Sequence, residues 1–515
     1  MPQDLPGFYY DAEKNRYFPI KSPIPGSSSR NSSSASTSAQ KPLPKPNNKS
    51  KHGERGMTPK VVKMLHVREL CGNSINVNKK NVNFQEQYQK LQTSKPTIWK
   101  YEGTQRIADA AIEHICLDVQ TPNGLTETEI LLTGGLNGTF CCYEVGYVGQ
   151  HAINGLQCMP NLLQPLNIEK ETASLKSAGV IWRPIGALVQ MPSNISSIKL
   201  PKNYHSQATD NNSSASHALI TTLGSETSGG SVYLMNISEP LEYDLGVAIL
   251  SRRIDEISRF KSTIWTADCN FNGTQAVIGT NIGAALVHIG SGRKTWICRS
   301  KSHVLSLQFD SSGNNVLCGL RNGGIVTVDT RQKPQDLRDT LPRHQIHFPL
   351  KSQRRDKQWF EMRGNVHLSK TISMPSSVSC LTGLKMYDDY FLASSMDGTV
   401  RLYDHRMSER GAVVQFYEGH VNSHTRIQIG VDPSERFFMS DWFLCGFVTS
   451  KCVGRGEDCC LRVWSIKSGE MLYEDKFMNS VASAVCWGWP RRSGTHFGGA
   501  WLGSQEGLFY VNNNL

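Results

Sequence analysis

The chain has 515 residues, of which 38% are apolar and 19% charged, so it can bury a large core and is not wholly disordered. Its formal net charge of +11 is of the kind found in proteins that bind nucleic acids or membrane surfaces. Residues 1–100, however, hold 17 basic and 6 acidic side chains, so the whole surplus lies there. Residues 101–515 are balanced, which excludes a strongly basic globular domain.

The N-terminal part of the chain divides by composition. Residues 1–21 are short and rich in aromatic residues, which predicts a segment that docks on another surface. Residues 22–57 are rich in Ser and Pro and poor in large apolar residues, so they cannot offset their ordering entropy by burial. We expect this second segment to be a disordered linker.

Residues 58–96 predict short amphipathic helices. The first begins at Thr58-Pro59, an N-cap followed by a first-turn proline. The second lies around residues 82–92, where Phe84, Tyr88 and Leu91 share one face. That face is as well suited to packing on the main domain as to docking on a partner, and the pattern leaves both open.

From residue 97 onward the pattern changes to short strands with polar-Gly turns. A unit of apolar strand, small-residue strand, turn and a further Val-, Tyr-, Trp- or Leu-containing strand recurs, and the turn glycines 283 and 324 lie 41 residues apart. This spacing is typical of one WD-type blade. We predict an all-β fold, a seven-bladed WD-repeat β-propeller over residues 97–515, with Thr97–Tyr101 as the outer strand of the last blade. The seven units lie at 130–143, 218–234, 276–287, 316–329, 391–404, 437–464 and 499–511.

The propeller region is longer than seven blades require. We assign the surplus to surface-loop insertions at 146–215 and 333–376, which are polar and contain Pro, and to residues 441–455, which split the sixth unit. Removing residues 441–455 would join Ser440 to Gly456 and restore a normal blade hairpin. We therefore hypothesise that this insertion is a retained intron or a gene-model error.

Several function classes have little support in the sequence. The 14 cysteines contain no Cys-x-x-Cys pair, which favours free buried thiols over a metal site. No stretch reaches the roughly 18 apolar residues of a membrane span, and residues 1–20 do not have the pattern of a signal peptide. We expect no cofactor, no metal and no membrane contact, and a location in the nucleus, the cytoplasm or both.

The sixth unit contains the residue types of a catalytic triad. In a WD-type blade, however, the same residues form a buried hydrogen-bond relay in which a turn Asp accepts from a loop His and a Ser links to a strand Trp. We expect this structural relay rather than catalysis, and we predict that the protein is not an enzyme. The relay residues are His420, Ser440, Asp458 and Trp464.

A basic cluster precedes Trp359 and Phe360. Lys351, Arg354, Arg355 and Lys357 could contact phosphate, but a solvated loop explains them at least as well because the globular region has no net positive charge. Binding of nucleic acid is therefore not expected.

The most informative motif is an Asp-x-Arg that follows the third strand in two neighbouring blades. The fourth unit ends with Asp329-Thr330-Arg331 and the fifth with Asp404-His405-Arg406. The Asp can orient the guanidinium, which then presents a planar fork to carbonyls or carboxylates of a partner. An ion pair within one blade would explain either motif alone, but two motifs on one rim favour a docking surface.

These motifs resemble the WD-x-Arg motifs of substrate receptors that bind the damaged-DNA-binding adaptor of cullin-4 RING ubiquitin ligases. The N-terminal string from Leu5 to Phe18, the string from Tyr417 to Asn422 and the string from Asp458 to Trp464 resemble the cullin-four-associated factor 4 group, also called the WD-repeat protein 21 group. In that family the residue before the Asp is usually Trp, whereas Val328 and Tyr403 stand there in this chain.

The resemblance implies a non-catalytic receptor. Arg331 and Arg406, oriented by Asp329 and Asp404, would dock the adaptor, and an unidentified protein substrate would be recruited for ubiquitination. The alternative is a general WD-repeat scaffold in a nuclear histone- or RNA-associated complex, with the basic tail contacting nucleic acid.

Overall fold

The computed structural model divides the chain into two units, Met1–Met57 and Thr58–Leu515. In the first, β1 (Phe8–Asp11) and β2 (Arg16–Pro19) form an antiparallel hairpin in which Phe8 lies opposite Pro19. The structure describes residues 8–11, 16–19, 84–121, 124–146, 155–164, 179–201, 217–225, 227–239, 241–242, 250–331, 341–345, 359–410, 413–419, 427–440, 459–488 and 499–512. The predicted helix from Thr58 and the insertion at 441–455 lie outside the described residues.

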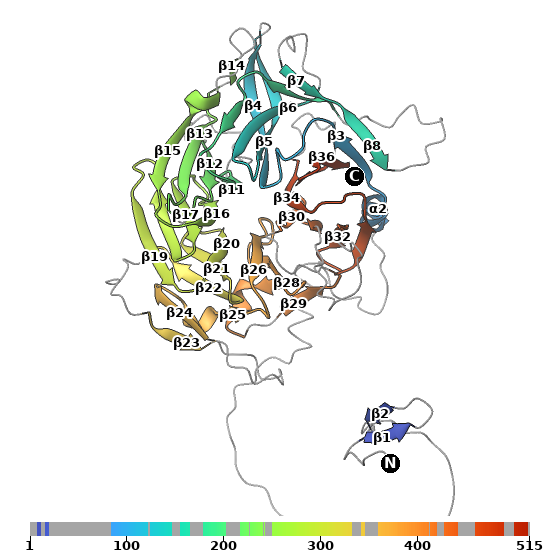
Figure 1. Ribbon diagram of the computed structural model, residues 1–515, viewed down its shortest axis with the longest axis vertical. Helices are drawn as coiled ribbons and strands as arrows, with labels where there is room; N and C mark the ends of the chain where they lie inside the picture. Colours follow the sequence, from blue (N-terminus) through green and yellow to red (C-terminus); the bar gives the residue numbers. More distant parts are fainter. Residues whose placement is uncertain are drawn as a thin grey trace, which may run out of the picture. The chain divides into compact units, whose positions relative to one another are not determined.

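The second unit is a seven-bladed β-propeller, as predicted (Figure 1). The first two blades are built from separate sheets, and the short β14 (Leu241–Glu242) pairs in parallel with the first strand of blade 1. Blade 1 contains β4 (Ala111–Thr121), β5 (Gly124–Gly134), β6 (Thr139–Val145), β7 (Gly155–Cys158), β9 (Ile181–Pro184) and β10 (Leu188–Gln190). Blade 2 contains β11 (Ile195–Lys199), β12 (His217–Thr222), β13 (Ser231–Asn236) and β15 (Ile254–Arg259), with η3 (Leu250–Arg253) before β15.

Blades 3 to 5 follow in chain order. Blade 3 contains β16 (Ile264–Cys269), β17 (Gln275–Thr280), β18 (Gly283–His288) and β19 (Lys294–Ser300), extended by β24 (Trp359–Gly364) and β23 (Arg343–Gln345). Blade 4 contains β20 (Val304–Phe309), β21 (Asn315–Leu320), β22 (Gly324–Asp329) and β25 (Ile372–Ser373). Blade 5 contains β26 (Val378–Gly383), β27 (Tyr390–Ser395), β28 (Val400–Asp404) and β29 (Val413–Tyr417). Two short helical turns, η4 (Leu368–Lys370) and η5 (His405–Arg410), contact each other beside blades 4 and 5.

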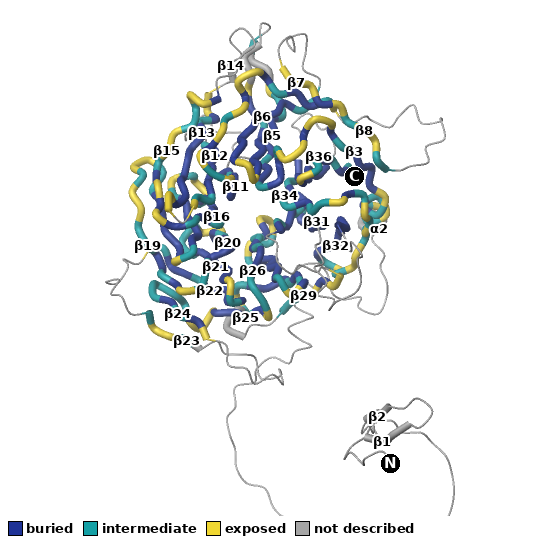
Figure 2. Tube along the Cα trace, viewed as in Figure 1, coloured by how far each residue is buried: buried dark blue, intermediate teal, exposed yellow. Residues whose placement is uncertain are grey.

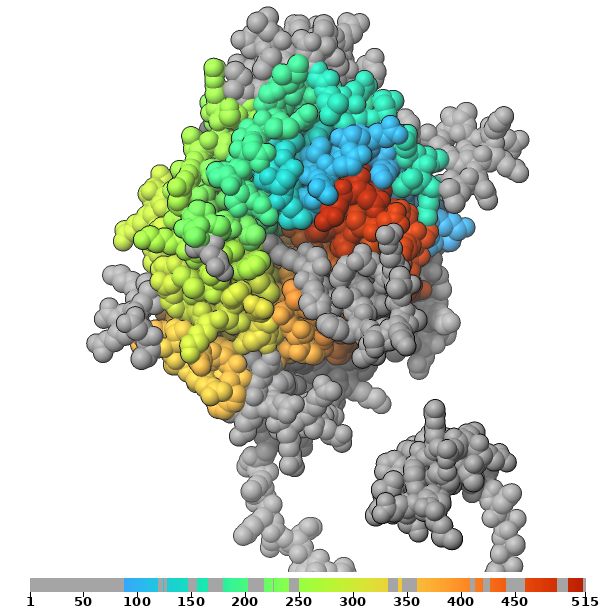
Figure 3. Space-filling view, viewed as in Figure 1, coloured from blue at the N-terminus to red at the C-terminus, as the bar shows by residue number. Residues whose placement is uncertain are grey.

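The last two blades close the ring. Blade 6 contains β30 (Gly430–Val431), β31 (Phe437–Ser440), β32 (Leu461–Ser465) and β33 (Met471–Asp475). Blade 7 contains β34 (Ala482–Trp487), β35 (Ala500–Ser504), β36 (Gly507–Asn512), β3 (Thr97–Tyr101) and β8 (Pro160–Gln164). β3 pairs with β36, with Thr97 opposite Asn512, which confirms the predicted closing strand. In Figure 3 the blue region that includes β3 lies against the red region of the last blade.

The core lies between neighbouring blades. Because each sheet is covered on both faces, the middle strands are buried along most of their length, as in β21 (Figure 2). Between blades 4 and 5, for example, Leu317 and Ile325 pack against Leu381, Phe391 and Tyr403. Tyr403 is 1% exposed and stacks on Phe391 with ring centroids 5.4 Å apart.

Two segments expected to be surface loops contain blade strands. Residues 146–215 include β11, the innermost strand of blade 2, as well as β9 and β10 on the outside of blade 1. Residues 333–376 include β25, the outer strand of blade 4, and β23 and β24 on the outside of blade 3. The prediction of loops there was wrong because these strands are short and rich in polar residues.

Residues 155–164 connect the first and last blades. β7 pairs with β9 of blade 1, and after Met159 the chain continues as β8, which pairs with β3 of blade 7. This strap, residues 155–164, therefore lies on the outside of the junction where the ring closes.

The predicted second helix is present as α2 (Phe84–Thr93). It contacts β33 of blade 6 through Lys90, whose Nζ donates to Ser468 Oγ and forms an ion pair with Glu470 Oε2, both at 3.1 Å. Tyr88 and Leu91 are 49% and 56% exposed. Lys90 thus joins the helix to its own propeller by polar contacts, and about half of the surface of Tyr88 and Leu91 is exposed.

Candidate docking site

The two Asp-x-Arg motifs occupy equivalent places in adjacent blades. β22 of blade 4 ends at Asp329, which lies opposite Asn315, and β28 of blade 5 ends at Asp404, which lies opposite Tyr390. In both cases the Asp is the last residue of the third strand and is buried, and the Arg follows just beyond the sheet.

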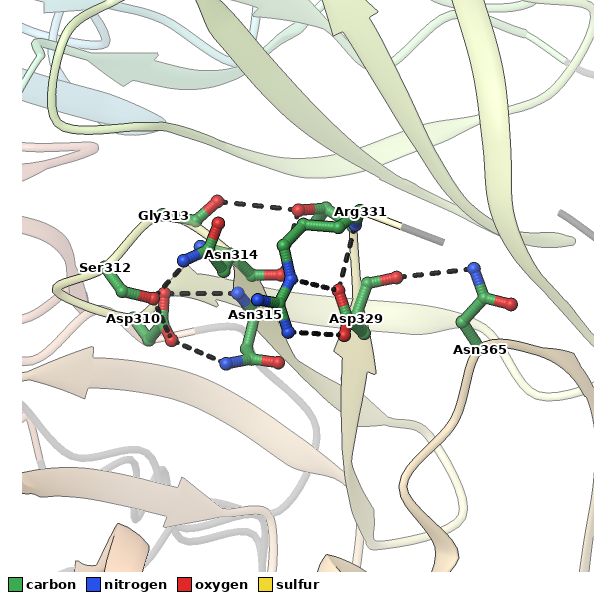
Figure 4. A network of polar contacts seen from close by, with 9 residues as sticks. Asp310, Ser312, Gly313, Asn314, Asn315, Asp329, Arg331 and Asn365 are labelled. Atoms are coloured by element: carbon green, nitrogen blue, oxygen red, sulfur yellow. Dashed lines mark hydrogen bonds and ion pairs between the residues drawn. The ribbon is translucent and has the colours of Figure 1, made fainter. Parts of the chain in front are cut away.

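Arg331 is held by Asp329 in a bidentate arrangement (Figure 4). Its Nε donates to Asp329 Oδ1 at 3.1 Å, its Nη2 donates to Asp329 Oδ2 at 2.9 Å, and its backbone N–H donates to Oδ1 at 2.9 Å. The Arg331 side chain is nevertheless 65% exposed, whereas that of Asp329 is 4% exposed. Within the described residues Arg331 has no other polar side-chain contact, so its Nη1 hydrogens face solvent.

Asp329 is itself fixed from the other side. Its backbone N–H donates to the Asn365 carbonyl at 2.9 Å, and Asn365 Nδ2 donates to the Asp329 carbonyl at 3.4 Å (Figure 4). The hydrogen bonds from Arg331 hold the pKa of Asp329 below its usual value. The carboxylate is therefore ionised at neutral pH and acts as a rigid support for the guanidinium.

Arg406 repeats this geometry in blade 5. Its Nε donates to Asp404 Oδ1 at 3.0 Å, its Nη2 donates to Oδ2 at 2.9 Å, and its backbone N–H donates to Oδ1 at 2.8 Å. Two residues of the preceding hairpin also hold it: Asp389 Oδ2 lies 3.2 Å from Nη1, and the Tyr390 hydroxyl lies 3.3 Å from Nη2. The Arg406 side chain is 47% exposed.

The two motifs lie on the same rim. The pKa of Arg331 is raised chiefly by Asp329 and, to a smaller extent, by Asp310 in the turn after β20. Asp310 also acts on the neighbouring motif, where it opposes the lowering of the pKa of His405 by burial. The His405 ring lies 4.7 Å from the Phe391 ring, and its backbone N–H donates to the Asp389 carbonyl at 2.8 Å. We call Asp329, Arg331, Asp404 and Arg406 the rim site.

Sequence reasoning missed several residues around the rim site. Asp389 forms an ion pair with Arg406, and Tyr390 contacts the same guanidinium with its hydroxyl and its ring; neither was predicted as a site residue. Leu368 of η4 is 48% exposed on the turn that contacts η5, which begins at His405. The sequence could have pointed to Asp389 and Tyr390 only by their position at the start of β27. Their contact with Arg406 becomes evident only when the register between β27 and β28 is known.

The predicted relay of the sixth blade is only partly within the described residues. Ser440 and Trp464 are buried, whereas His420 and Asp458 lie outside the described part. Trp464 Nε1 donates to the Glu418 carbonyl at 3.0 Å, and the indole stacks on Phe438 with ring centroids 4.9 Å apart. The relay stays a prediction.

Three further features of the described residues concern cysteines, metal ligands and membrane spans. Within the described ranges, the 11 cysteines form no disulfide with one another. Over those same ranges, no group of three or more His, Cys, Asp or Glu residues is placed to hold a metal ion. No helix in the described part is long and apolar enough to cross a membrane.

No family model matches the sequence. The chain is 24% identical over 173 residues, 34% of its length, to DDB1- and CUL4-associated factor 4 of Bos taurus. It is 31% identical over 96 residues, 18% of its length, to DDB1- and CUL4-associated factor 4-like protein 2 of Homo sapiens. It is also 22% identical over 279 residues, 52% of its length, to the uncharacterized WD repeat-containing protein F47D12.9 of Caenorhabditis elegans.

These matches cover 26%, 20% and 42% of the three relatives, so the chain spans less than half the length of each. Together with the seven blades, they show a WD-repeat propeller that is similar to DDB1- and CUL4-associated factors.

Proposed function

We propose that this chain is a non-catalytic substrate receptor that docks on the damaged-DNA-binding adaptor of a cullin-4 RING ubiquitin ligase and recruits proteins for ubiquitination. The observation that carries the proposal is the rim site, in which Arg331 and Arg406 are held by the same three contacts in adjacent blades. The names of two relatives, which associate with DDB1 and CUL4, support the choice of partner.

The geometry suits docking. A guanidinium that is fixed in advance loses little side-chain entropy when a partner binds. The Nη1 group of Arg331, which Asp329 does not engage, can recognise carbonyls or carboxylates in the plane of the fork. Each Arg is supported by a buried Asp and exposed on its outer side, so the fork is both rigid and accessible.

Recruitment needs no chemistry from this chain. A receptor acts by raising the effective concentration of its target near the conjugating enzyme carried by other subunits. Neither a cofactor nor a metal is part of the proposal, and we place the protein in the nucleus, the cytoplasm or both, where such a ligase would act.

Capture of the purified adaptor by the immobilised full-length chain tests the proposal. Removal of one well-buried interface Arg typically costs about 2 kcal/mol or more, so Arg331→Ala combined with Arg406→Ala should reduce capture to background. Arg259→Ala is the matched control. Arg259 is also 65% exposed and is held in a bidentate fashion by Glu256, at 2.9 Å for both contacts, but it lies in blade 2. Undiminished capture by the double variant would refute the role of the rim site.

The basic N-terminal region favours a second function, a general scaffold in a histone- or RNA-associated complex. Residues 1–100 carry the whole net charge of +11, which would give salt-dependent affinity for nucleic acid. Deletion of residues 1–60 separates the two functions, because a scaffold would lose retention on nucleic acid whereas a receptor would keep its adaptor.

A further inference from the structure

The strap carries a strand edge on the outside of the junction between blades 1 and 7. It comprises β7, Met159 and β8 (Figure 1). Among the described strands, β7 pairs with β9 alone and β8 pairs with β3 alone, so each is the last strand of its sheet. About half of the backbone N–H and C=O groups of such a strand face away from the sheet. These groups are available to a further strand.

The sequence of the strap gives this edge little protection. Exposed strand edges are usually shielded by charged side chains, by Pro or by being short. The outer strand of blade 2, β15, contains Asp255 and Glu256, and that of blade 6, β33, contains Glu474 and Asp475. The outer strand of blade 4, β25, has only two residues. The strap has ten residues and no charge, and Pro160 is its one shielding residue.

The strap also exposes apolar side chains on both of its faces. Leu156 and Leu162 are 41% and 42% exposed, and Met159 is 52% exposed. Gln157 and Asn161 are exposed as well. Because successive side chains of a strand point to opposite faces, the two leucines share one face and Met159 shares the other with the two amides.

The order of these side chains is symmetric about Met159. We propose that the strap joins two copies of this chain by antiparallel edge-to-edge pairing about a twofold axis through Met159. Leu156 of each copy then lies opposite Leu162 of the other, so apolar side chains meet. Gln157 lies opposite Asn161, and the two Met159 side chains meet at the axis. A shift of the register by one residue would place Leu156 opposite Asn161 and lose this match.

The backbone suits this register. The Glu102 N–H donates to the Met159 carbonyl at 3.3 Å, so the backbone groups of Met159 face β3. Since these groups alternate along an antiparallel strand, the two Met159 residues form a non-hydrogen-bonded pair, with Cα atoms about 4.5 Å apart. Leu156 and Leu162 then form hydrogen-bonded pairs on both sides of the axis. Pro160 removes one donor on each side, which weakens the pairing without preventing it.

Charge favours a second copy as the partner strand. Two straps meet without like-charge repulsion, and a charged segment of another protein would find no counter-charge on the strap itself. The acid next to the strap is Glu102, which accepts a hydrogen bond from Asn161 Nδ2. In the dimer the two Glu102 residues lie three strand spacings apart, about 14 Å, which exceeds the screening length of about 8 Å.

The size of the contact sets its strength. Ten residues of strand are about 33 Å long, and a sheet with its side chains is about 10 Å thick, so the edge covers about 330 Å² in each copy. The two copies together bury about 660 Å², whereas a stable interface needs about 1,200 Å². The dimer is therefore reversible, and its population rises with protein concentration.

This pairing does not rest on the proposed function. The strap lies at the junction of blades 1 and 7, whereas the rim site is built on blades 4 and 5. Adaptor capture should survive changes in the strap, and dimer formation should survive Arg331→Ala with Arg406→Ala. The two proposals therefore fail separately.

Disulfide trapping in the purified full-length chain tests both the partner and the register. In Met159→Cys the two new thiols face each other at the axis, with Cα atoms about 4.5 Å apart, which is within the range for a disulfide. Oxidation with diamide should give a covalent dimer on a non-reducing gel, in at least fivefold higher yield than the wild type. Gln157→Cys is the matched control, because its two copies lie about 13 Å apart, too far for a disulfide.

Sedimentation velocity measures the dimer without a cross-link. Between about 1 and about 100 µM the wild type should shift from monomer towards dimer. Met159→Lys places two like charges opposite each other and should weaken the dimer at least tenfold. A mixture of Met159→Lys and Met159→Glu should restore it, because opposite charges then meet at the axis. Met386→Lys is the control, since Met386 is 67% exposed in blade 5, and its dimer should be unchanged.

Three outcomes would overturn the inference. A wild-type chain that stays monomeric over the whole concentration range would leave the strap to another occupant. Equal trapping of Met159→Cys and Gln157→Cys would contradict the register. A dimer that Met159→Lys does not weaken, or that the mixture with Met159→Glu does not restore, would place the contact elsewhere on the molecule.

Discussion

At the scale of single residues, the rim site depends on a local contact between residues two positions apart. Asp329 holds Arg331, and Asp404 holds Arg406, each through both carboxylate oxygens. Such contacts are readable from the sequence because the spacing fixes them. Tyr390 and Asp389, which also hold Arg406, could not be found in this way, since they belong to the preceding strand and its turn.

Replacement of the supporting acid should weaken docking without removing the arginine. In Asp329→Asn one carboxylate oxygen becomes an NH₂ donor, so the bidentate support of Arg331 is lost and the fork becomes mobile. We expect adaptor affinity to fall about tenfold, less than for Arg331→Ala, when measured by biolayer interferometry. Equal affinity of Asp329→Asn and the wild type would mean that the orientation of Arg331 is unimportant.

Glu144 should make stability depend on pH. Burial raises the pKa of this β6 carboxyl from 4.5 to about 7, partly offset by a hydrogen bond from Thr128, and one of its oxygens is buried without a partner in the described part. The folded state therefore binds more protons than the unfolded state between about pH 4.5 and 7, and stability falls as pH rises through this range.

Glu144→Gln removes that titration. The variant should be more stable than the wild type at pH 8, by on the order of 2 kcal/mol, and should show no such advantage at pH 4.5, where the wild-type carboxyl is protonated in the folded state. Chemical denaturation of both proteins at the two pH values measures this difference. The same difference at both pH values would contradict the assignment to ionisation.

At the scale of strands, regular apolar alternation was enough to predict a strand from the sequence. Strands that contain small polar residues were not predicted. Thr97–Tyr101 was predicted as the closing strand and is found as β3. β11 was taken as a loop because Ser196 and Ser197 interrupt its apolar residues. Both serines are buried, and Ser196 Oγ lies 2.8 Å from Thr221 Oγ1 on β12. The Ser196 hydroxyl is satisfied only once the neighbouring strand is in place.

The insertion in blade 6 leads to a prediction about deletion. β31 ends at Ser440 and β32 begins at Leu461, and the two strands pair with Ser440 opposite Arg462. Deletion of residues 441–455 would shorten the connection from 20 residues to 5. Loop-closure entropy then predicts a gain of about 1 kcal/mol, with a melting temperature equal to or above that of the full chain. An insoluble or less stable deletion protein would show that residues 441–455 belong to the fold.

At the scale of the whole molecule, ring closure joins the two ends of the propeller sequence. β3 is the fourth strand of a blade whose first three strands come from residues 482–512. The interface contains Trp99, Tyr101, Trp501 and Tyr510, whose rings lie 4.7 to 6.0 Å apart in contacting pairs. The loss of β3 would expose Trp501, Tyr510 and the edge of β36.

Truncation tests this closure. A chain that begins at residue 84 should keep the melting temperature of the full chain, because it retains α2 and β3. A chain that begins at residue 102 should melt at a lower temperature and aggregate, since an unpaired apolar strand edge invites intermolecular pairing. Differential scanning fluorimetry and size-exclusion chromatography measure the two effects. A monomeric, equally stable chain from residue 102 would show that the ring does not need this strand.

The strap on the outside of the ring junction affects the order in which strands can pair during synthesis. During synthesis β3 emerges about 400 residues before β36, its partner in the closed ring. β8 emerges only about 60 residues after β3 and pairs with its other edge, with Trp99 opposite Leu162. While the nascent chain leaves the ribosome, β8 can therefore pair with one edge of β3 before the last blade has been synthesised.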